Sequence, residues 1–289
     1  MLRQSTRLLV TGALGMALAG GAQAQDDTIE IGWTAWSDAE FVTKLASRLI
    51  NENTDHTVEL VQTDIAPQYQ GIETGDIDAM MMAWLPATHE DYYEEIAPNV
   101  ENLGVLYNGA RLGWVVPDYI PESQLSSLSD LSNESVRDKL DGRITGIDPG
   151  AGLTQLSESA IEEYELDGYN LQTSSGAGMT AALDRATNRE EWVVVTGWSP
   201  HWKFGAYDLR YLEDPQGVLG GPERVHVLAR AGFDADYPQI SQVLTRMYLS
   251  LDELQGYMFE ARESSYDEAI SQFIDENPDQ VNYWLTGEF

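Results

Sequence analysis

The feature that most restricts the fold of this chain is a short pattern that occurs twice. An apolar run ends in Trp-x-Pro with a His just beyond it, first at residues 79–89 and again at residues 193–202. Apolar or β-branched runs bounded by Gly and Pro are typical of short buried strands. Each pattern therefore places a large aromatic side chain, Trp84 or Trp198, at a strand end, where doubly wound α/β folds bind ligands. The repetition predicts two similar lobes that face one cleft.

The segments around these patterns alternate between strand and helix. Strands are predicted at residues 28–33, 56–61, 77–83, 112–116, 143–147, 192–196 and 225–229. Helices are predicted from a capping box at 37–40, and at 67–74, 154–164, 178–187 and over most of the last sixty residues. This order predicts an α/β fold of two lobes, each a mostly parallel sheet flanked by helices. The polar segment 121–133 is the predicted passage between the lobes.

The N-terminal segment has the pattern of a secretory leader. Arg3 and Arg7 precede an apolar stretch, and Ala22-Gln23-Ala24 then offers small residues for cleavage. We therefore expect a signal peptide at residues 1–24 and a mature protein that is periplasmic or secreted. The chain has no Cys, which excludes disulfides, thiolate metal sites and a lipid-modified cysteine.

These boundaries divide the mature chain into two expected lobes. Lobe 1 is predicted at residues 25–117, and the C-terminal segment 226–289 is a candidate to join it. Lobe 2 is predicted at residues 118–225. We expect the ligand cleft between them and the protein to be a monomer.

The charge of the chain is strongly acidic. There are 48 Asp and Glu against 16 Lys and Arg, for a formal net charge of −32. Such a field repels phosphate backbones and anionic lipids, which argues against nucleic-acid or membrane-surface binding. Solvation of the whole surface, as in proteins of salt-loving cells, accounts for the acidity.

The candidate ligand contacts are aromatic. Trp36 directly follows the first strand, while Trp84 and Trp198 end theirs, so all three are expected on the cleft side. Three indole faces around one space suit a quaternary ammonium, which has no N–H to donate and is held by the negative ring faces. Stacking on a sugar is the competing use, but it also needs several polar contacts to hydroxyl groups, and no such set is evident.

A glycine-rich turn and one histidine could complete such a site. The loop that begins with Gly146 and Ile147 follows a strand and precedes a helix, so its N–H groups could bind a carboxylate. A structural turn that needs glycine at positive φ is an equal alternative. His89 could contact the same carboxylate or hold the Trp84 loop in place. The spacing of the four His predicts no metal site, and no nucleophile motif or cofactor motif indicates an enzyme.

Four segments of the chain, taken in order, resemble the substrate-binding proteins of glycine betaine/proline betaine ABC importers. They are residues 34–40, 83–89, 146–152 and 196–202. The resemblance implies a prism of Trp36, Trp84 and Trp198 around a trimethylammonium group. It also implies that the backbone amides of Gly146 and Ile147, together with His89, meet the ligand carboxylate.

The resemblance implies a periplasmic binding protein that delivers a compatible solute to a membrane permease for osmoprotection. Glycine betaine or a close analogue is the expected ligand, with choline, carnitine or a sulfonium zwitterion as alternatives. A secreted carbohydrate-active enzyme is a more distant alternative, since it would need a catalytic carboxylate pair.

Overall fold

The computed structural model describes residues 28–288. The leader predicted at residues 1–24 lies outside these described residues. Among residues 28–288, no helix is both long enough and apolar enough to cross a membrane.

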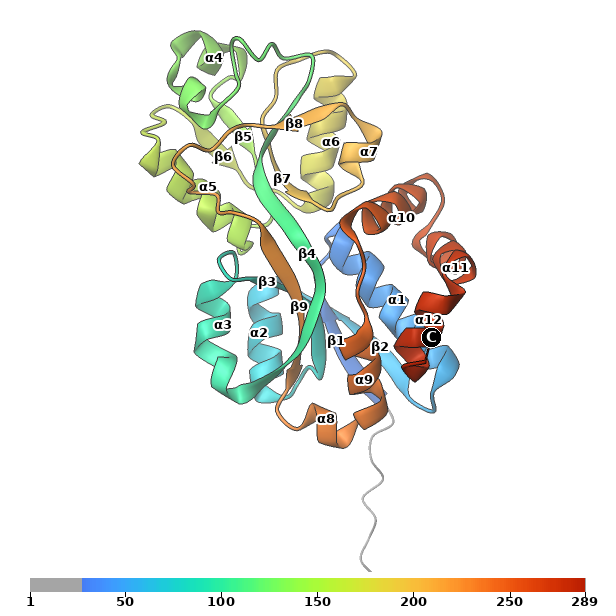
Figure 1. The fold of residues 1–289 in the computed structure, drawn as a ribbon. Coiled ribbons are helices and arrows are strands. Elements are labelled where there is room, and N and C mark those ends of the chain that lie inside the picture. The colour runs from blue at the N-terminus through green and yellow to red at the C-terminus, as the bar shows by residue number, and fades with distance from the viewer. Residues whose placement is uncertain (1–27, 289) are drawn as a thin grey trace, which may run out of the picture.

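Within residues 28–288, eight strands form one continuous path of pairing, and a ninth strand pairs with one of them (Figure 1). The order is β2-β1-β3-β9-β4-β7-β5-β6, and β8 pairs with β4 beside this path. The strands are β1 (Thr28–Trp33), β2 (Thr57–Gln62), β3 (Ala79–Leu85), β4 (Val100–Pro117), β5 (Arg143–Thr145), β6 (Asn170–Gln172), β7 (Val195–Ser199), β8 (Leu209–Tyr211) and β9 (Glu223–Arg230).

The long strand β4 joins the two lobes. Its residues 100–110 pair with β9, whereas residues 111–115 pair with β7 and residues 115–117 pair with β8. Our prediction that the chain passes between the lobes in the polar segment 121–133 is therefore wrong, because the chain crosses within β4. Segment 121–133 instead folds into the second lobe and buries three leucines spaced by three residues, Leu125, Leu128 and Leu131.

The α/β prediction is confirmed, but the sheets are mixed. Parallel pairing holds for β2-β1-β3 and for β6-β5-β7. Every pairing of β4 and β9 is antiparallel. The expectation of mostly parallel sheets therefore describes the outer strands, while the strands that run between the lobes pair in the opposite sense.

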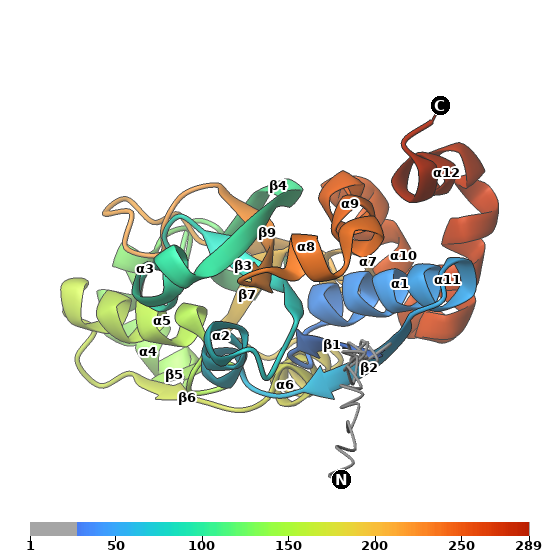
Figure 2. The same cartoon turned by 90° about the horizontal axis from the view of Figure 1, so that it is seen from below.

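Helices cover both faces of each sheet (Figures 1 and 2). In the first lobe α2 and α3 lie on one side of the sheet and α1 and α9 on the other (Figure 1). The α-helices are α1 (Ser37–Asn53), α2 (Ile65–Thr74), α3 (Glu90–Ile96), α4 (Glu134–Lys139), α5 (Gly152–Glu163), α6 (Gly176–Thr187), α7 (Lys203–Ala206), α8 (Phe233–Asp236), α9 (Pro238–Arg246), α10 (Leu251–Glu263), α11 (Tyr266–Glu276) and α12 (Pro278–Thr286). Short 3-10 helices lie at Ala97–Asn99 and Leu128–Ser132.

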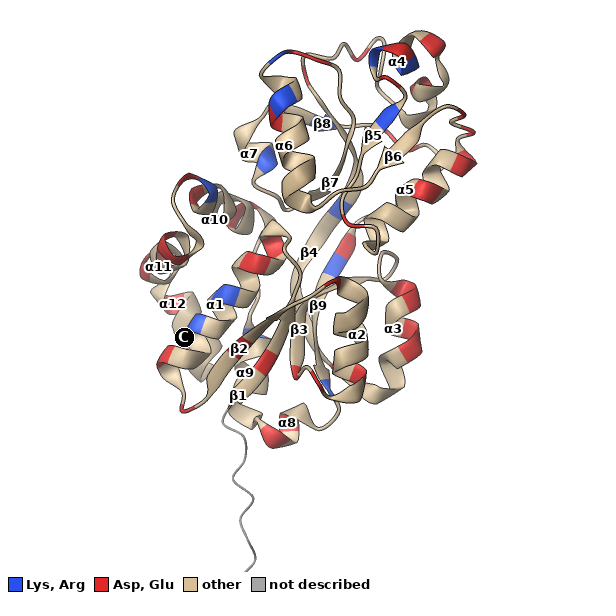
Figure 3. Cartoon of the chain, turned by 180° about the vertical axis from the view of Figure 1, so that it is seen from behind, with Lys and Arg blue, Asp and Glu red and all other residues tan. Residues whose placement is uncertain are grey.

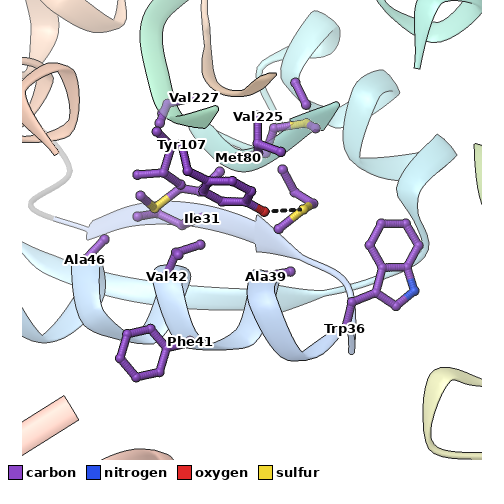
Figure 4. Packing of buried hydrophobic residues seen from close by; sticks show 14 of the residues in the cluster. Ile31, Trp36, Ala39, Phe41, Val42, Ala46, Met80, Tyr107, Val225 and Val227 are labelled. Carbon is purple, nitrogen blue, oxygen red and sulfur yellow. Dashed lines mark hydrogen bonds between the residues drawn. The ribbon is translucent and has the colours of Figure 1, made fainter. Parts of the chain in front are cut away.

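The buried side chains divide into two clusters. The larger is built around β1, β3, β9 and α1, and it includes residues of α9 to α12 such as Ile240, Leu254 and Phe273. The smaller contains Trp114 and surrounds β5 and α5 in the second lobe. Figure 4 shows the larger cluster, with Tyr107 of β4 among residues of β1, β3, β9 and α1 and with Trp36 at its edge.

Helix α1 begins at Ser37 as predicted, but the capping box does not form. Trp36 is the N-cap residue and the helix has no side-chain cap. Glu40 pairs instead with Lys44 at 2.6 Å, and Asp38 points into the protein, where it is fully buried. Asp38 is therefore available for a role other than helix capping.

Candidate functional site

A small cavity lies where strand ends of the two lobes meet. Its volume is about 20 Å³, comparable to the space that one water molecule occupies in protein cavities. The lining residues from the first lobe and from β4 are Trp36, Trp84, Thr88, His89 and Leu112. The second lobe contributes Ile147, Ala151, Gly152, Leu153 and Trp198. The structure thus places five of the six predicted site residues around one space, and Gly146 is not among them.

The local sequence explains how the tryptophans reach this space. Trp84 is the penultimate residue of β3 and Trp198 the penultimate residue of β7, and each strand is followed by a cis X-Pro bond. Trp36 follows the last residue of β1 by three positions and precedes α1. Because all three lie at strand ends that point toward the other lobe, their indoles converge between the lobes.

The ring geometry forms aromatic walls. The centroids of Trp36 and Trp198 are 6.4 Å apart with their planes tilted by 59°. His89 stacks near Trp36 with a centroid distance of 6.4 Å and an interplanar angle of 28°. Trp84 meets Tyr107 edge to face at 6.4 Å. Such an arrangement presents negative ring faces from several directions, as cation recognition by aromatic boxes requires.

Two of the indoles are tied to carboxylates of the opposite lobe. Trp36 donates from Nε1 to Asp148 Oδ2 at 2.9 Å, and Trp198 donates from Nε1 to Asp38 Oδ1 at 3.0 Å. The third indole, Trp84, donates to the Met82 sulfur within its own strand. The exchange between lobes is reciprocal, because each lobe supplies one tryptophan and one acceptor. These hydrogen bonds both orient the rings and hold the lobes together.

The carboxyl group of Asp38 is buried and accepts hydrogen bonds from two aromatic side chains. Burial raises its pKa, while hydrogen bonds from Tyr107 and Trp198 stabilise the carboxylate and oppose that rise. Sequence reasoning treated Asp38 only as part of a capping box. Its position two residues after Trp36 is the signal that could have identified it, since the first turn of α1 begins at the cavity.

His89 lines the cavity as a neutral imidazole. It is 1% exposed, and burial lowers its pKa to about 3, with a backbone hydrogen bond to Met82 opposing part of that shift. Its Nδ1 accepts the N–H of Trp84 at 3.1 Å. With Nδ1 as an acceptor, the ring proton of the neutral form lies on Nε2, so the other nitrogen can donate a hydrogen bond.

The amide of Gly146 is already used by the sheet. It donates to the carbonyl of Gln172 at 2.9 Å, one residue beyond the pairing of Thr145 with Gln172. The prediction that this amide meets a carboxylate is therefore not supported, because the β5–β6 ladder continues through it. Within residues 28–288 the N–H of Ile147 has no hydrogen-bond partner, and Ile147 lines the cavity.

The start of α5 offers donors that sequence reasoning missed. Gly152 and Leu153 are the first two residues of α5 and both line the cavity. Their N–H groups have no partner among residues 28–288, as expected for the first turn of a helix. Unpaired N–H groups at a helix N-terminus favour anions. The glycine-rich turn thus offers free amides near the cavity at Ile147 as well as at Gly152 and Leu153, but not at Gly146.

The two lobes also touch beside the cavity. A Cβ added at Gly152 would lie 2.3 Å from the carbonyl oxygen of Thr88, so only glycine permits this approach. Thr88 is held in turn by Glu223, whose buried carboxylate accepts from both its N–H and its hydroxyl group. Tyr92 adds a hydrogen bond to the carbonyl of Gly150 at 3.1 Å.

Comparisons with known proteins identify similar sequences and similar folds. The family described as the substrate-binding domain of ABC-type glycine betaine transport systems matches residues 27–276. The glycine betaine/carnitine transport binding protein GbuC of Listeria monocytogenes is 38% identical over 159 residues, which are 54% of this chain. That alignment covers 53% of GbuC, so the chain spans about half the length of this relative.

Two solved structures share nearly the whole fold. Lactococcal OpuAC in a closed conformation with glycine betaine superposes with a TM-score of 0.83 at 30% identity, covering 90% of this chain and 99% of that one. A choline-binding protein of an ABC transporter, in complex with choline, superposes with a TM-score of 0.82 at 25% identity. The latter covers 91% of this chain and 93% of that one.

Proposed function

The chain belongs to the family of substrate-binding domains of ABC-type glycine betaine transport systems, and from this premise we propose that it captures glycine betaine or a similar quaternary ammonium compound. The observation that carries the proposal is the convergence of Trp36, Trp84 and Trp198 on one cavity between the lobes. Each ring face is worth about 0.5–2 kcal/mol toward a cation. We expect Trp36→Ala, Trp84→Ala and Trp198→Ala each to weaken binding substantially.

The ligand carboxylate has three candidate donors in our proposal. These are the free amide of Ile147, the first amides of α5, and Nε2 of His89. A lost hydrogen bond to a charged group costs about 1.5–3 kcal/mol. His89→Ala should therefore weaken glycine betaine about tenfold to a hundredfold and affect choline, which has no carboxylate, far less. Equal losses for both ligands would mean that His89 only holds the Trp84 loop.

The choice among related ligands is open to a direct test. Isothermal titration calorimetry with glycine betaine, proline betaine, choline, carnitine and a sulfonium zwitterion would rank them. We expect the carboxylate-bearing compounds to bind more tightly than choline, because the α5 amides and His89 meet a charged acceptor in a carboxylate but only a neutral hydroxyl in choline. A tighter choline complex would favour the alternative that this is a choline receptor. If none of these compounds binds measurably, the proposed function is wrong.

We propose that the two lobes close on the ligand. In this proposal lobe 1 consists of residues 25–117 together with residues 226–289, and lobe 2 consists of residues 118–225. The supporting observations are that the walls of the cavity come from both sides and that, among residues 28–288, β4 is the strand that pairs with strands of both sheets. Small-angle scattering should show compaction when glycine betaine is added. An unchanged profile at saturation would contradict closure.

The proposed setting is outside the cytoplasmic membrane, with delivery to the permease of an ABC importer. The family description supports the transport role. Asp and Glu residues lie on helices of both lobes, including α3, α5 and α11 (Figure 3). Osmotic uptake of a compatible solute in a salt-rich habitat would suit this acidic surface.

A further inference from the structure

A buried lysine lies behind one wall of the cavity. Lys203 is the first residue of α7 and is 0% exposed. Its Nζ has no hydrogen-bond partner among residues 28–288 and lies 4.4 Å from the ring centroid of Trp198. Lysine is almost never fully buried without a pairing partner, so this position calls for an explanation in terms of its surroundings.

Lys203 reaches Trp198 from outside the cavity. The residues that line the cavity include Trp198 but not Lys203. The lysine stem instead packs beside Gly197, where an added Cβ would lie 3.3 Å from its Cε. The same indole can therefore have the lysine on one side and a bound ligand on the other.

The charged and titratable groups around the lysine come from three other parts of the structure. Asp38 of α1 is the acid whose charge favours the protonated amine, and Tyr107 of β4 donates to that acid. His201, whose Nδ1 accepts the N–H of Lys203, packs its ring on Trp198 at 4.6 Å. From α10, Arg262 lies over Trp202 at 4.8 Å.

Burial lowers the pKa of Lys203 well below its usual value, and the charge of Asp38 opposes that shift. Burial and the charge of Lys203 lower the pKa of His201 as well. The negative charge of Asp38 thus favours the protonated, positively charged form of Lys203.

A ligand cation would compete with this arrangement. The ring face of Trp198 and the carboxylate of Asp38 stabilise a positive charge on either side of the indole. Two cations on opposite faces would be roughly 9 Å apart, because a ligand would sit about as far from the ring as Nζ does. Like charges at that distance in a protein interior weaken binding on the order of tenfold.

We propose that Lys203 sets the affinity of the site as the resident counter-charge of Asp38, so that binding of a quaternary ammonium expels one proton from its ammonium group. An N–H bond of the ammonium breaks, the proton passes to solvent, and a neutral amine stays behind Trp198. The ligand then replaces the lysine as the counter-charge of Asp38. This inference rests on the proposed function, because it needs a cationic ligand in the cavity.

The test is calorimetry with glycine betaine in buffers of different ionisation enthalpy, from about pH 6 to about pH 9. The wild type should release up to one proton per ligand and bind more tightly as the pH rises. Lys203→Met keeps an unbranched side chain without the charge. It should release no proton, bind on the order of tenfold more tightly at the acidic end of the range, and show a flat pH profile.

A matched control is available at a second lysine. Lys139 lies 4.2 Å from the ring of Trp192, remote from the cavity, so Lys139→Met should behave as the wild type does. The carbon isostere 3,3-dimethylbutyrate has the shape and carboxylate of glycine betaine without its cation. Its affinity should not rise in Lys203→Met, because loss of a positive charge gives an anion no gain, and measurable binding verifies that the variant is folded.

Unchanged proton release in Lys203→Met would overturn the inference and assign the proton to Asp38 or His201. Equal strengthening of both ligands would also overturn it, because that result reflects a change of shape and not of charge. If the wild type binds neither ligand, the proposed function itself fails.

Discussion

Replacing Trp198 by Phe should weaken ligand binding without unfolding the protein. Phe keeps an aromatic face toward the cavity but removes the indole N–H that donates to Asp38 at 3.0 Å. The two residues belong to different lobes, so this hydrogen bond contributes only while the lobes are together. We therefore expect the loss to appear in the dissociation constant of the closed complex and not in the stability of the ligand-free protein.

The size of the expected loss of affinity follows from the burial of Asp38, which accepts the hydrogen bond from Trp198. A hydrogen bond to a charged group is worth about 1.5–3 kcal/mol, and the change from Trp to Phe also gives a weaker cation–π face. Binding of glycine betaine should weaken about tenfold to a hundredfold. Trp36→Phe removes the equivalent hydrogen bond to Asp148. Because Asp148 is only half-buried, this variant should lose less affinity than Trp198→Phe.

Calorimetry and thermal unfolding without ligand separate the two effects, and Trp114→Phe is the matched control. Trp114 donates to Ser157 at 2.9 Å inside the second lobe, where both groups are buried. That variant should lower the melting temperature and leave the affinity nearly unchanged. The reasoning is refuted if Trp198→Phe lowers the melting temperature as Trp114→Phe does while binding ligand like the wild type.

Three further changes test other parts of the site. Gly152→Ala should weaken binding at least tenfold, because its Cβ would meet the Thr88 carbonyl at 2.3 Å, whereas Gly150→Ala meets nothing within 4 Å and should bind normally. Glu223→Gln should also weaken binding, measured by calorimetry, since its carboxylate holds Thr88; wild-type affinity would contradict this role. His89 has its pKa lowered from 6.5 to about 3, so its stabilising effect is complete above pH 6.5 and is lost as the pH falls toward 3. In urea unfolding, the wild type should lose up to about 1.4 kcal/mol of stability per pH unit more than His89→Gln in that window, and equal slopes would contradict this assignment.

The sequence predicts the parts of this structure that depend on local patterns. The apolar runs that end in Trp84 and Trp198 are β3 and β7, because a short strand bounded by Gly and Pro is encoded in consecutive residues. The turn before α5 and the end of α2 at Gly75, which has φ of 83°, are local in the same sense. Of these elements, β3 and β7 supply two of the three indoles of the candidate site.

Pairings between distant residues could not be predicted in this way. The bond from Trp198 to Asp38 joins residues 160 positions apart, and it depends on how the lobes dock. The first part of β4 has irregular pairing with β9 and positive φ at Gly104 and Gly109, so its sequence lacks the two-residue period of a regular strand. The resemblance implied that the amide of Gly146 meets the ligand, and the continuation of the β5–β6 ladder that uses this amide is not visible in the chain itself.

The most direct test of the central claim compares glycine betaine with 3,3-dimethylbutyrate on the wild-type protein by calorimetry. The two compounds share shape and carboxylate and differ in the charge of the trimethyl end. If three indoles between the lobes recognise a cation, glycine betaine should bind at least about tenfold more tightly, since each ring contributes about 0.5–2 kcal/mol. Equal affinities would show that the cavity selects shape alone and would contradict the account.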